Sequence, residues 1–296
     1  MRYTMAKTVL ITGANGQLGN EMRLVLDGND AFSPIFTDVQ ELDITSKEAI
    51  DAFFANHPID YVVNCAAYTA VDNAEDNVEL CTRLNADAVE YLAQAAKFHG
   101  AKMVQISTDY VFNGTNFRPY REDDETSPCS VYGSTKLDGE HRLLQCLPDA
   151  VIFRTAWLYS PFGKNFVKTM LNLGRTKETL SVIFDQVGTP TYAKDLAVAI
   201  MNVLTAEQWH SGVYHFSDEG AISWYDFTKA IHRIAGIATC NVKPCTTAEY
   251  PTKAKRPHFS VLDKSKYKTT FNASIPYWED SLRECINRIE NKQHYI

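Results

Sequence analysis

Tyr132 and Lys136 have the side-chain types and the spacing needed to transfer a proton. Four residues apart in a predicted helix, they lie on one helical face. A phenol with its ordinary pKa of about 10 is a poor proton donor at neutral pH. A neighbouring ammonium lowers that pKa because it favours the phenolate. Thr108 follows a predicted strand that ends at the same edge, and the Tyr–Lys pair predicts proton transfer by an acid there.

The position of this pair carries more information than its spacing, which occurs three times in the chain. Tyr225 and Lys229 stand in an amphipathic stretch between Trp224 and Phe227, where packing explains them. Only the pair at 132 and 136 follows a strand that ends in Ser-Thr, at the edge of a sheet where ligands are expected.

Short apolar strands alternate with helical segments through the first half of the chain. Continuous apolar strands separated by helices imply a parallel sheet covered on both faces, and ligands of such sheets bind beyond the carboxyl ends of the strands. Ser46 is a plausible helix N-cap, and Gly100 a helix end. The expected strands are 8–12, 31–37, 61–65, 102–107 and 150–154, and the expected helices are 17–26, 46–56, 77–100 and 131–146.

The second half is less regular and contains several proline-bearing loops. Helices are expected at 165–173, 195–205, 224–234 and 278–291. The expected fold class is α/β, a Rossmann-type doubly wound parallel sheet with a smaller α+β substrate-binding lobe. Residues 1–156, with about 188–211, form the expected dinucleotide-binding domain, and residues 157–187 and 212–296 form the smaller lobe.

A glycine-rich turn, Gly13-Ala14-Asn15-Gly16-Gln17-Leu18-Gly19, follows the first strand and opens the first helix. The glycines permit a tight turn, close approach of a pyrophosphate to the backbone, and close packing of helix on strand. The helix N-terminus then presents free N–H groups and the positive end of its dipole. This context predicts dinucleotide binding, with an ordinary glycine turn as the alternative.

Asp38 ends the second strand, 19 residues after Gly19. A carboxylate at this place can accept hydrogen bonds from the adenosine ribose, which favours NAD over NADP. Asp43 and Ile44 follow and could flank the adenine. The alternative for Asp38 is a solvated carboxylate at a strand end.

Composition excludes several classes of protein. Hydrophobic residues make up 45% and charged residues 22% of the 296 residues, which is typical of a globular protein. The net charge of −7 argues against nucleic-acid binding. No apolar run is long enough for a membrane span. The N-terminus lacks a signal-peptide layout, so we expect a cytoplasmic protein. Seven scattered cysteines predict no disulfide framework, and the histidines lack metal-binding spacing.

Several segments together resemble one family of extended short-chain dehydrogenases, the dTDP-4-dehydrorhamnose reductases. The glycine turn and the Tyr–Lys pair are shared across the superfamily, whereas AAYTAVD, STDYVF and the DQ-GTPT pattern are more specific. The resemblance runs from about residue 8 to about residue 285. The matching segments are GANGQLG, ELDITS, VVNCAAYTAVDNAE, STDYVFNG, YGSTKLDGE, RTAWLYSPFGKNFV, DQVGTPTY and RPHFSVLDKSK.

The resemblance implies a set of site residues and a cofactor. It implies NADPH or NADH as cofactor, a sugar nucleotide as substrate, and a homodimer as a possible assembly; some relatives bind Mg²⁺ at a subunit contact. The catalytic residues it implies are Thr108, Tyr132 and Lys136, and the substrate contacts are Thr108, Asp109, Tyr110 and Trp157. With the glycine turn, the cofactor contacts are Gly13, Ala14, Asn15, Gly16, Gln17, Leu18, Asp38, Asp43, Ile44, Ala66, Ala67, Tyr68, Tyr132 and Lys136.

The reaction implied is reduction of the C4 ketone of dTDP-4-dehydro-β-L-rhamnose to dTDP-L-rhamnose. Tyr132 protonates the new alkoxide, Thr108 hydrogen-bonds to the same oxygen, and Lys136 holds the nicotinamide ribose and lowers the pKa of the tyrosine. One alternative is a sugar-nucleotide epimerase or dehydratase. A dehydratase of this fold typically carries Asp-Glu after the threonine, whereas this chain has Asp109-Tyr110. Another alternative is a non-catalytic nucleotide-binding regulatory subunit of a methionine adenosyltransferase.

Some of these residues also have a purely structural interpretation. Trp157 could be a core aromatic residue, and Tyr110 could pack a loop. Arg256 could bind a substrate pyrophosphate or be an ordinary surface arginine.

Overall fold

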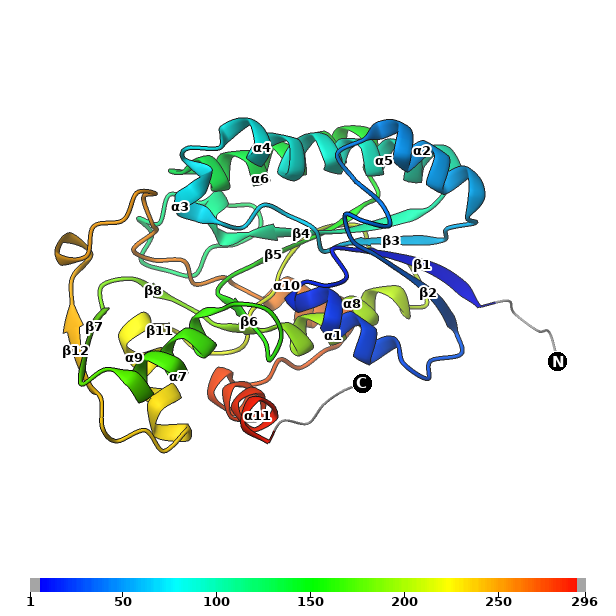
Figure 1. Cartoon of the computed structure of the whole chain (residues 1–296). Coiled ribbons are helices and arrows are strands. Elements are labelled where there is room, and N and C mark those ends of the chain that lie inside the picture. The colour runs from blue at the N-terminus through cyan, green and yellow to red at the C-terminus, as the bar shows by residue number, and fades with distance from the viewer. Residues whose placement is uncertain (1–5, 292–296) are drawn as a thin grey trace.

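A six-stranded parallel sheet forms the centre of the computed structural model, which describes residues 6–291 (Figure 1). The strand order is β10-β5-β4-β3-β1-β2, and neighbouring strands run parallel throughout. The order reverses beside β1, which places the ligand crevice beyond the carboxyl ends of β1 and β3. The strands are β1 (Lys7–Thr12), β2 (Phe32–Thr37), β3 (Tyr61–Asn64), β4 (Lys102–Thr108), β5 (Val151–Thr155) and β10 (Gly212–His215).

Helices cover both faces of this sheet, as Figure 1 shows, and this confirms the predicted fold class. Each face has its own apolar cluster, so strand residues such as Val9 and Leu10 are completely buried. On one face lie α2 (Lys47–Asn56), α5 (Ala88–His99) and α6 (Val131–Cys146). On the other lie α1 (Gln17–Leu26), α8 (Ala193–Leu204) and α10 (Ser265–Phe271).

The helix expected at 77–100 is helical throughout but not uniform. It consists of α4 (Val78–Thr82), a π-helical turn at Arg83–Asp87, and α5. Gly100 ends it with a left-handed φ of 73°, as predicted. Ser46 caps α2 by accepting a hydrogen bond from the Ala49 N–H, which confirms that prediction as well.

The second half of the chain builds a smaller cluster beyond the carboxyl ends of the strands. Its apolar core gathers residues of three amphipathic helices. These are α7 (Phe166–Thr176), α9 (Trp224–Ile234) and α11 (Trp278–Glu290). Short parallel or antiparallel pairs complete it: β6 (Leu158–Tyr159) with β9 (Thr191–Tyr192), β7 (Thr179–Ile183) with β12 (Asn241–Cys245), and β8 (Val187–Gly188) with β11 (Ile222–Ser223).

One expected boundary is wrong. Residues 212–296 were expected wholly in the smaller lobe, but β10 pairs with β5 and forms an edge of the main sheet. Tyr267 of α10 is also part of the apolar cluster under that sheet. The strand has only four residues, and its place depends on pairing with a strand some 60 residues earlier, which local sequence patterns do not reveal.

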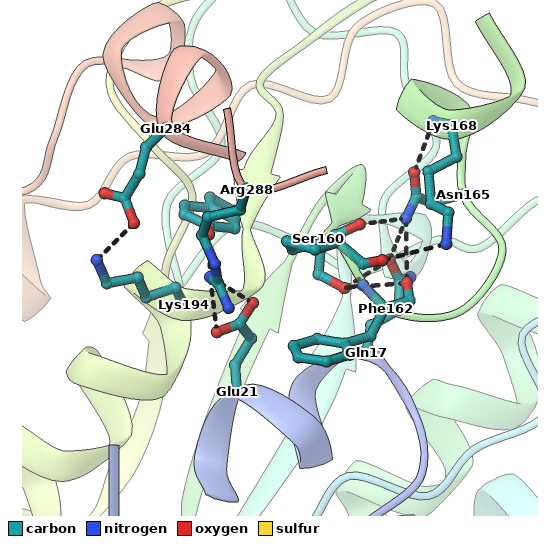
Figure 2. A network of polar contacts seen from close by, with 11 residues as sticks. Gln17, Glu21, Ser160, Phe162, Asn165, Lys168, Lys194, Glu284 and Arg288 are labelled. Atoms are coloured by element: carbon teal, nitrogen blue, oxygen red, sulfur yellow. Dashed lines mark hydrogen bonds and ion pairs between the residues drawn. The ribbon is translucent and has the colours of Figure 1, made fainter. Parts of the chain in front are cut away.

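The last helix is joined to the first by a buried ion pair, shown in Figure 2. The Arg288 guanidinium of α11 lies 2.9 Å from a carboxylate oxygen of Glu21 in α1. Both side chains are less than a tenth exposed, and Arg288 also contacts the Tyr192 hydroxyl. Because leaving one buried charge unpaired is costly, this pair fixes α11 against the helix that follows the glycine turn.

Candidate active site

A cleft of about 790 Å³ opens beyond the carboxyl ends of β1, β3 and β4. A second hollow of about 510 Å³ is lined partly by the same residues, including Thr69, Trp157 and Trp224, and so extends the cleft. The predicted site residues that line the cleft are Gly13, Gly16, Gln17, Leu18, Asp38, Asp43, Ile44, Ala66, Ala67, Thr108, Asp109, Tyr110, Tyr132, Lys136 and Trp157.

The glycine turn forms one wall of the cleft, and its shape requires glycine. Gly13 has a φ of 61°, and a Cβ there would lie 2.7 Å from the Ala66 nitrogen. A Cβ at Gly19 would overlap the Gly13 carbonyl oxygen, so a side chain there would push α1 away from the strand. Gly16 is the N-cap of α1, which leaves the first N–H groups of the helix at the cleft.

Asp38 holds the turn from the end of β2. Its carboxylate accepts hydrogen bonds from the Asn15 N–H at 3.1 Å and from the Val39 N–H at 2.8 Å. Asp43 accepts hydrogen bonds from the N–H and hydroxyl of Thr45, and these lower the pKa of the Asp43 carboxyl. The structure thus places both carboxylates at the same end of the cleft as the glycine turn.

Three predicted cofactor residues, Ala14, Asn15 and Tyr68, are not among the residues that line the cleft. Ala14 is almost completely buried, and Asn15 meets Asp38 through its backbone. The backbone of Tyr68 is held by Asn85 of the π-helical turn. The Asn85 side chain accepts from the Tyr68 N–H at 2.9 Å and donates to its carbonyl at 3.1 Å.

Thr108, Tyr132 and Lys136 line the same cleft. Thr108 is the last residue of β4, and α6 begins one residue before Tyr132. Ser130 caps α6 by accepting from the Gly133 N–H at 3.2 Å. A Cβ at Gly133 would overlap the Tyr110 carbonyl oxygen, so this glycine lets α6 approach the end of β4.

The pKa of Tyr132 differs from the expectation. Burial raises the pKa of this phenol to about 12, while a hydrogen bond with Thr108 acts in the opposite direction. Lys136 was expected to lower the pKa of Tyr132, but its amine instead donates to the Ile106 carbonyl at 2.6 Å. Burial also lowers the pKa of Lys136 to about 8, opposed by the charge of Glu140.

A buried ion pair supports this part of the site from below, and sequence reasoning missed it. Arg154 of β5 lies 2.7 Å from the carboxylate of Glu140, one helical turn after Lys136, and both are nearly inaccessible. Ser107, which precedes Thr108, also donates to Glu140. The spacing could have indicated Glu140, because a carboxylate four residues after Lys136 in a helix shares a face with the predicted Tyr–Lys pair.

The residues expected to contact substrate lie where the cleft meets its extension. Burial raises the pKa of the Asp109 carboxyl to about 6 despite hydrogen bonds, including one from the Thr108 hydroxyl at 3.0 Å. Tyr110 packs edge-to-face against Tyr132, with ring centroids 5.4 Å apart. Trp157 has a φ of 49°, uncommon for a large residue.

Trp224 was also missed as a site residue. Its ring stacks on Trp157 at 3.5 Å between centroids, and both rings line the cleft and its extension. Arg256 lines the extension too, but its guanidinium lies 2.7 Å from the carboxylate of Asp72. Nothing local in the sequence connects these pairs, whose members are far apart along the chain.

Metal-binding clusters and membrane-spanning helices are both absent from the part of the chain that the structure describes. Within residues 6–291, no three side chains of histidine, cysteine, aspartate or glutamate gather closely enough to hold a metal ion. No helix in the same range is long and apolar enough to cross a membrane.

A glycine turn after β1 and a Tyr–Lys pair beside the end of β4, brought into one cleft, define the short-chain dehydrogenase/reductase class. Comparison with known proteins then identifies the family. Residues 7–291 match the family model described as the RmlD substrate binding domain. This chain therefore belongs to the dTDP-4-dehydrorhamnose reductase family.

Individual relatives agree with this assignment. The dTDP-4-dehydrorhamnose reductase of Aggregatibacter actinomycetemcomitans is 39% identical over 93% of this chain and 97% of its own length. A solved dTDP-4-dehydrorhamnose reductase from Clostridium acetobutylicum is 46% identical, with a TM-score of 0.92 over 96% of this chain and 99% of that one. The enzyme from Bacillus anthracis, solved in complex with NADP, is 36% identical with a TM-score of 0.91, over 95% and 99% of the two chains.

Proposed function

We propose that this chain reduces the C4 ketone of dTDP-4-dehydro-β-L-rhamnose to dTDP-L-rhamnose, using NADH or NADPH. The observation that carries the proposal is the meeting of Thr108, Tyr132 and Lys136 with the glycine turn in one cleft. Family membership supports the choice of substrate, because the curated relatives at 39–40% identity include dTDP-4-dehydrorhamnose reductases.

The residues at the glycine turn fit a dinucleotide. Side chains are excluded at Gly13 and Gly19, so backbone N–H groups at the start of α1 face the cleft and can accept a pyrophosphate. Asp38 and Asp43 line the same cleft and would bind the adenosine. When bound, the reduced nicotinamide would supply a hydride to the ketone carbon.

The roles proposed for the chain's own residues follow from their places. Tyr132 donates the proton to the ketone oxygen, and Thr108, whose hydroxyl already interacts with that phenol, hydrogen-bonds to the same oxygen. Lys136 binds the nicotinamide ribose with its amine and, once turned toward the phenol, favours the phenolate that remains after transfer. Trp157 and Asp109 orient the sugar.

The dehydratase alternative gains no support from the site. Such an enzyme needs a second carboxylate next to Asp109 to remove the C5 proton, and Tyr110 occupies that position against the Tyr132 ring. An assay with the keto-sugar nucleotide, following the loss of NADH or NADPH absorbance and identifying the product sugar, separates reduction from both dehydration and a purely regulatory role.

Replacement of Tyr132 by phenylalanine should lower the rate by about 10²- to 10⁴-fold, the usual contribution of a positioned acid. Tyr225→Phe is the matched control, because Tyr225 heads a Tyr–Lys pair of the same spacing on α9, and it should retain the parental rate. Wild-type turnover by Tyr132→Phe would overturn the assignment of the proton donor.

A further inference from the structure

The loop Ser160–Asn165, called here the capping loop, lies directly over the first residue of α1 (Figure 2). The Asn165 side chain donates to the Gln17 amide oxygen at 2.8 Å, and Ser160 donates to the same oxygen at 3.4 Å. Gly163 has a φ of 61°, and a Cβ there would come within 3.2 Å of the Gln17 side chain. Gln17 therefore uses its side chain to hold this loop.

The capping loop is also fixed from its other side. Lys168 of α7 donates to the Pro161 carbonyl at 3.1 Å. Asn165 caps α7 by accepting from the Lys168 N–H, and its amide donates to the Ser160 carbonyl at 2.7 Å. The Arg288 guanidinium lies 5.8 Å from the centroid of the Phe162 ring. These contacts give the loop one defined position over the glycine turn.

The glycine turn itself is short of positive charge. The segment from Gly13 to Gly19 contains no cation, and a helix N-terminus supplies only about half a charge. Arg23 of α1 lies over the Phe36 ring, 4.1 Å from its centroid. Lys136 is buried and donates to the Ile106 carbonyl. None of these cations therefore faces a pyrophosphate at the start of α1, and a cation from another segment would strengthen its binding.

Lys164 is the cation in the right place. It lines the cleft together with Gly13, Gly16 and Gln17. Its side chain is exposed, and among residues 6–291 no carboxylate forms an ion pair with it. The lysine directly follows the left-handed turn at Gly163, on the loop that Gln17 holds.

We propose that Lys164 contacts the pyrophosphate of the bound dinucleotide from the side opposite α1, and that Gln17 is a positioning residue that presents it by holding the capping loop. The inference rests on the proposed dinucleotide binding and adds to it a cationic contact supplied by the second half of the chain. A pyrophosphate held between a helix N-terminus and an ammonium binds both more strongly, because each of these groups shields the other's contact with the phosphate from water.

The test measures binding rather than turnover. Lys164→Gln should weaken NADH binding about tenfold, the effect of losing one charge-assisted hydrogen bond at a partly exposed site. Titration of the whole protein, followed by nicotinamide fluorescence, gives this affinity. When ADP or adenosine competes with NADH, the variant should show the same loss of affinity for ADP as for NADH. Its affinity for adenosine, which carries no phosphate, should be unchanged. Added salt should weaken the parent more steeply than the variant.

Two controls separate the charge from the fold. Lys164→Arg should bind NADH within about threefold of the parent, because it keeps the cation. Lys177→Gln, at an exposed lysine at the end of α7, should leave binding unchanged. A double-mutant cycle tests the positioning role of Gln17: Gln17→Ala and Lys164→Gln should combine to less than the product of their separate losses.

Each outcome decides the question. If the parent binds NADH and Lys164→Gln binds it equally well, the contact with pyrophosphate is refuted while the proposed function stands. An equal loss for adenosine also refutes it, because the effect would not depend on phosphate. Fully multiplicative losses in the cycle refute the role of Gln17. A parent that binds neither NADH nor NADPH overturns the proposed function together with this inference.

Discussion

The buried amine of Lys136 predicts how stability should change with pH. Only 3% of this residue is exposed, and burial lowers its pKa from 10.5 to about 8. The unfolded chain exposes the amine, so between those two values the unfolded state binds a proton that the folded state has lost. Stability therefore rises with pH through this window. The difference in pKa corresponds to about 3 kcal/mol in total.

Lys136→Met removes this titration and keeps a long, flexible side chain. The free energy of unfolding of the parent should rise by about 2 kcal/mol relative to that of Lys136→Met between about pH 7 and about pH 9.5. Other titrating groups contribute equally to both proteins and cancel in the difference. Urea unfolding followed by tryptophan fluorescence at a series of pH values measures it.

Lys177→Met is the matched control, because Lys177 is exposed at the end of α7. Its difference from the parent should stay constant over the same range. A difference for Lys136→Met that also stays constant would refute the reasoning, since the amine would then titrate alike in the folded and unfolded chains. Lys136→Met should also lose reductase activity at every pH. At low pH, Lys136 therefore lowers the stability of the parent while its activity still requires this residue.

Two further predictions concern the packing around α6. Glu140→Gln leaves Arg154 buried without its counter-ion and should lower the free energy of unfolding by about 3–5 kcal/mol in urea titrations. Glu140→Leu combined with Arg154→Met should recover most of that loss. A loss below about 1 kcal/mol for Glu140→Gln would contradict the role of the pair. Gly133→Ala places a methyl group against the Tyr110 carbonyl and should lower the free energy of unfolding by about 1–3 kcal/mol and remove most of the activity. Ser134→Ala, on the exposed side of the helix, is the control and should change neither. A fully active and equally stable Gly133→Ala would show that the close approach of α6 is dispensable.

Local signals were sufficient to predict the elements that hold the glycine turn and the Tyr–Lys pair. The bounds of α1, α6 and α9 agree with the sequence prediction to the residue. Ser130 and Ser223 are N-caps just before a helical pattern, so the local sequence indicates where each helix begins. The resemblance to the reductase family then selected which residues at the strand ends to consider.

Contacts between distant segments could not be predicted in the same way. The hydrogen bond between Gln17 and Asn165 joins residues 148 apart, and neither residue has a pattern that points to the other. The pKa of Tyr132 also depends on tertiary structure, because burial raises it while the Lys136 amine, one helical turn away, donates to the Ile106 carbonyl instead. Spacing along a helix shows which residues share a face but not how much water reaches them.

The pairing of Arg288 with Glu21 has a consequence for synthesis on the ribosome. The first strands and helices leave the ribosome early and can fold as they emerge, yet the partner of Glu21 lies 267 residues later in the chain. The Glu21 carboxylate of α1 thus remains without its Arg288 partner until α11 has been made. A chain stopped before residue 288 would keep its sheet residues but lack the guanidinium that pairs with Glu21, so this contact between α1 and α11 forms only after Arg288 has been made.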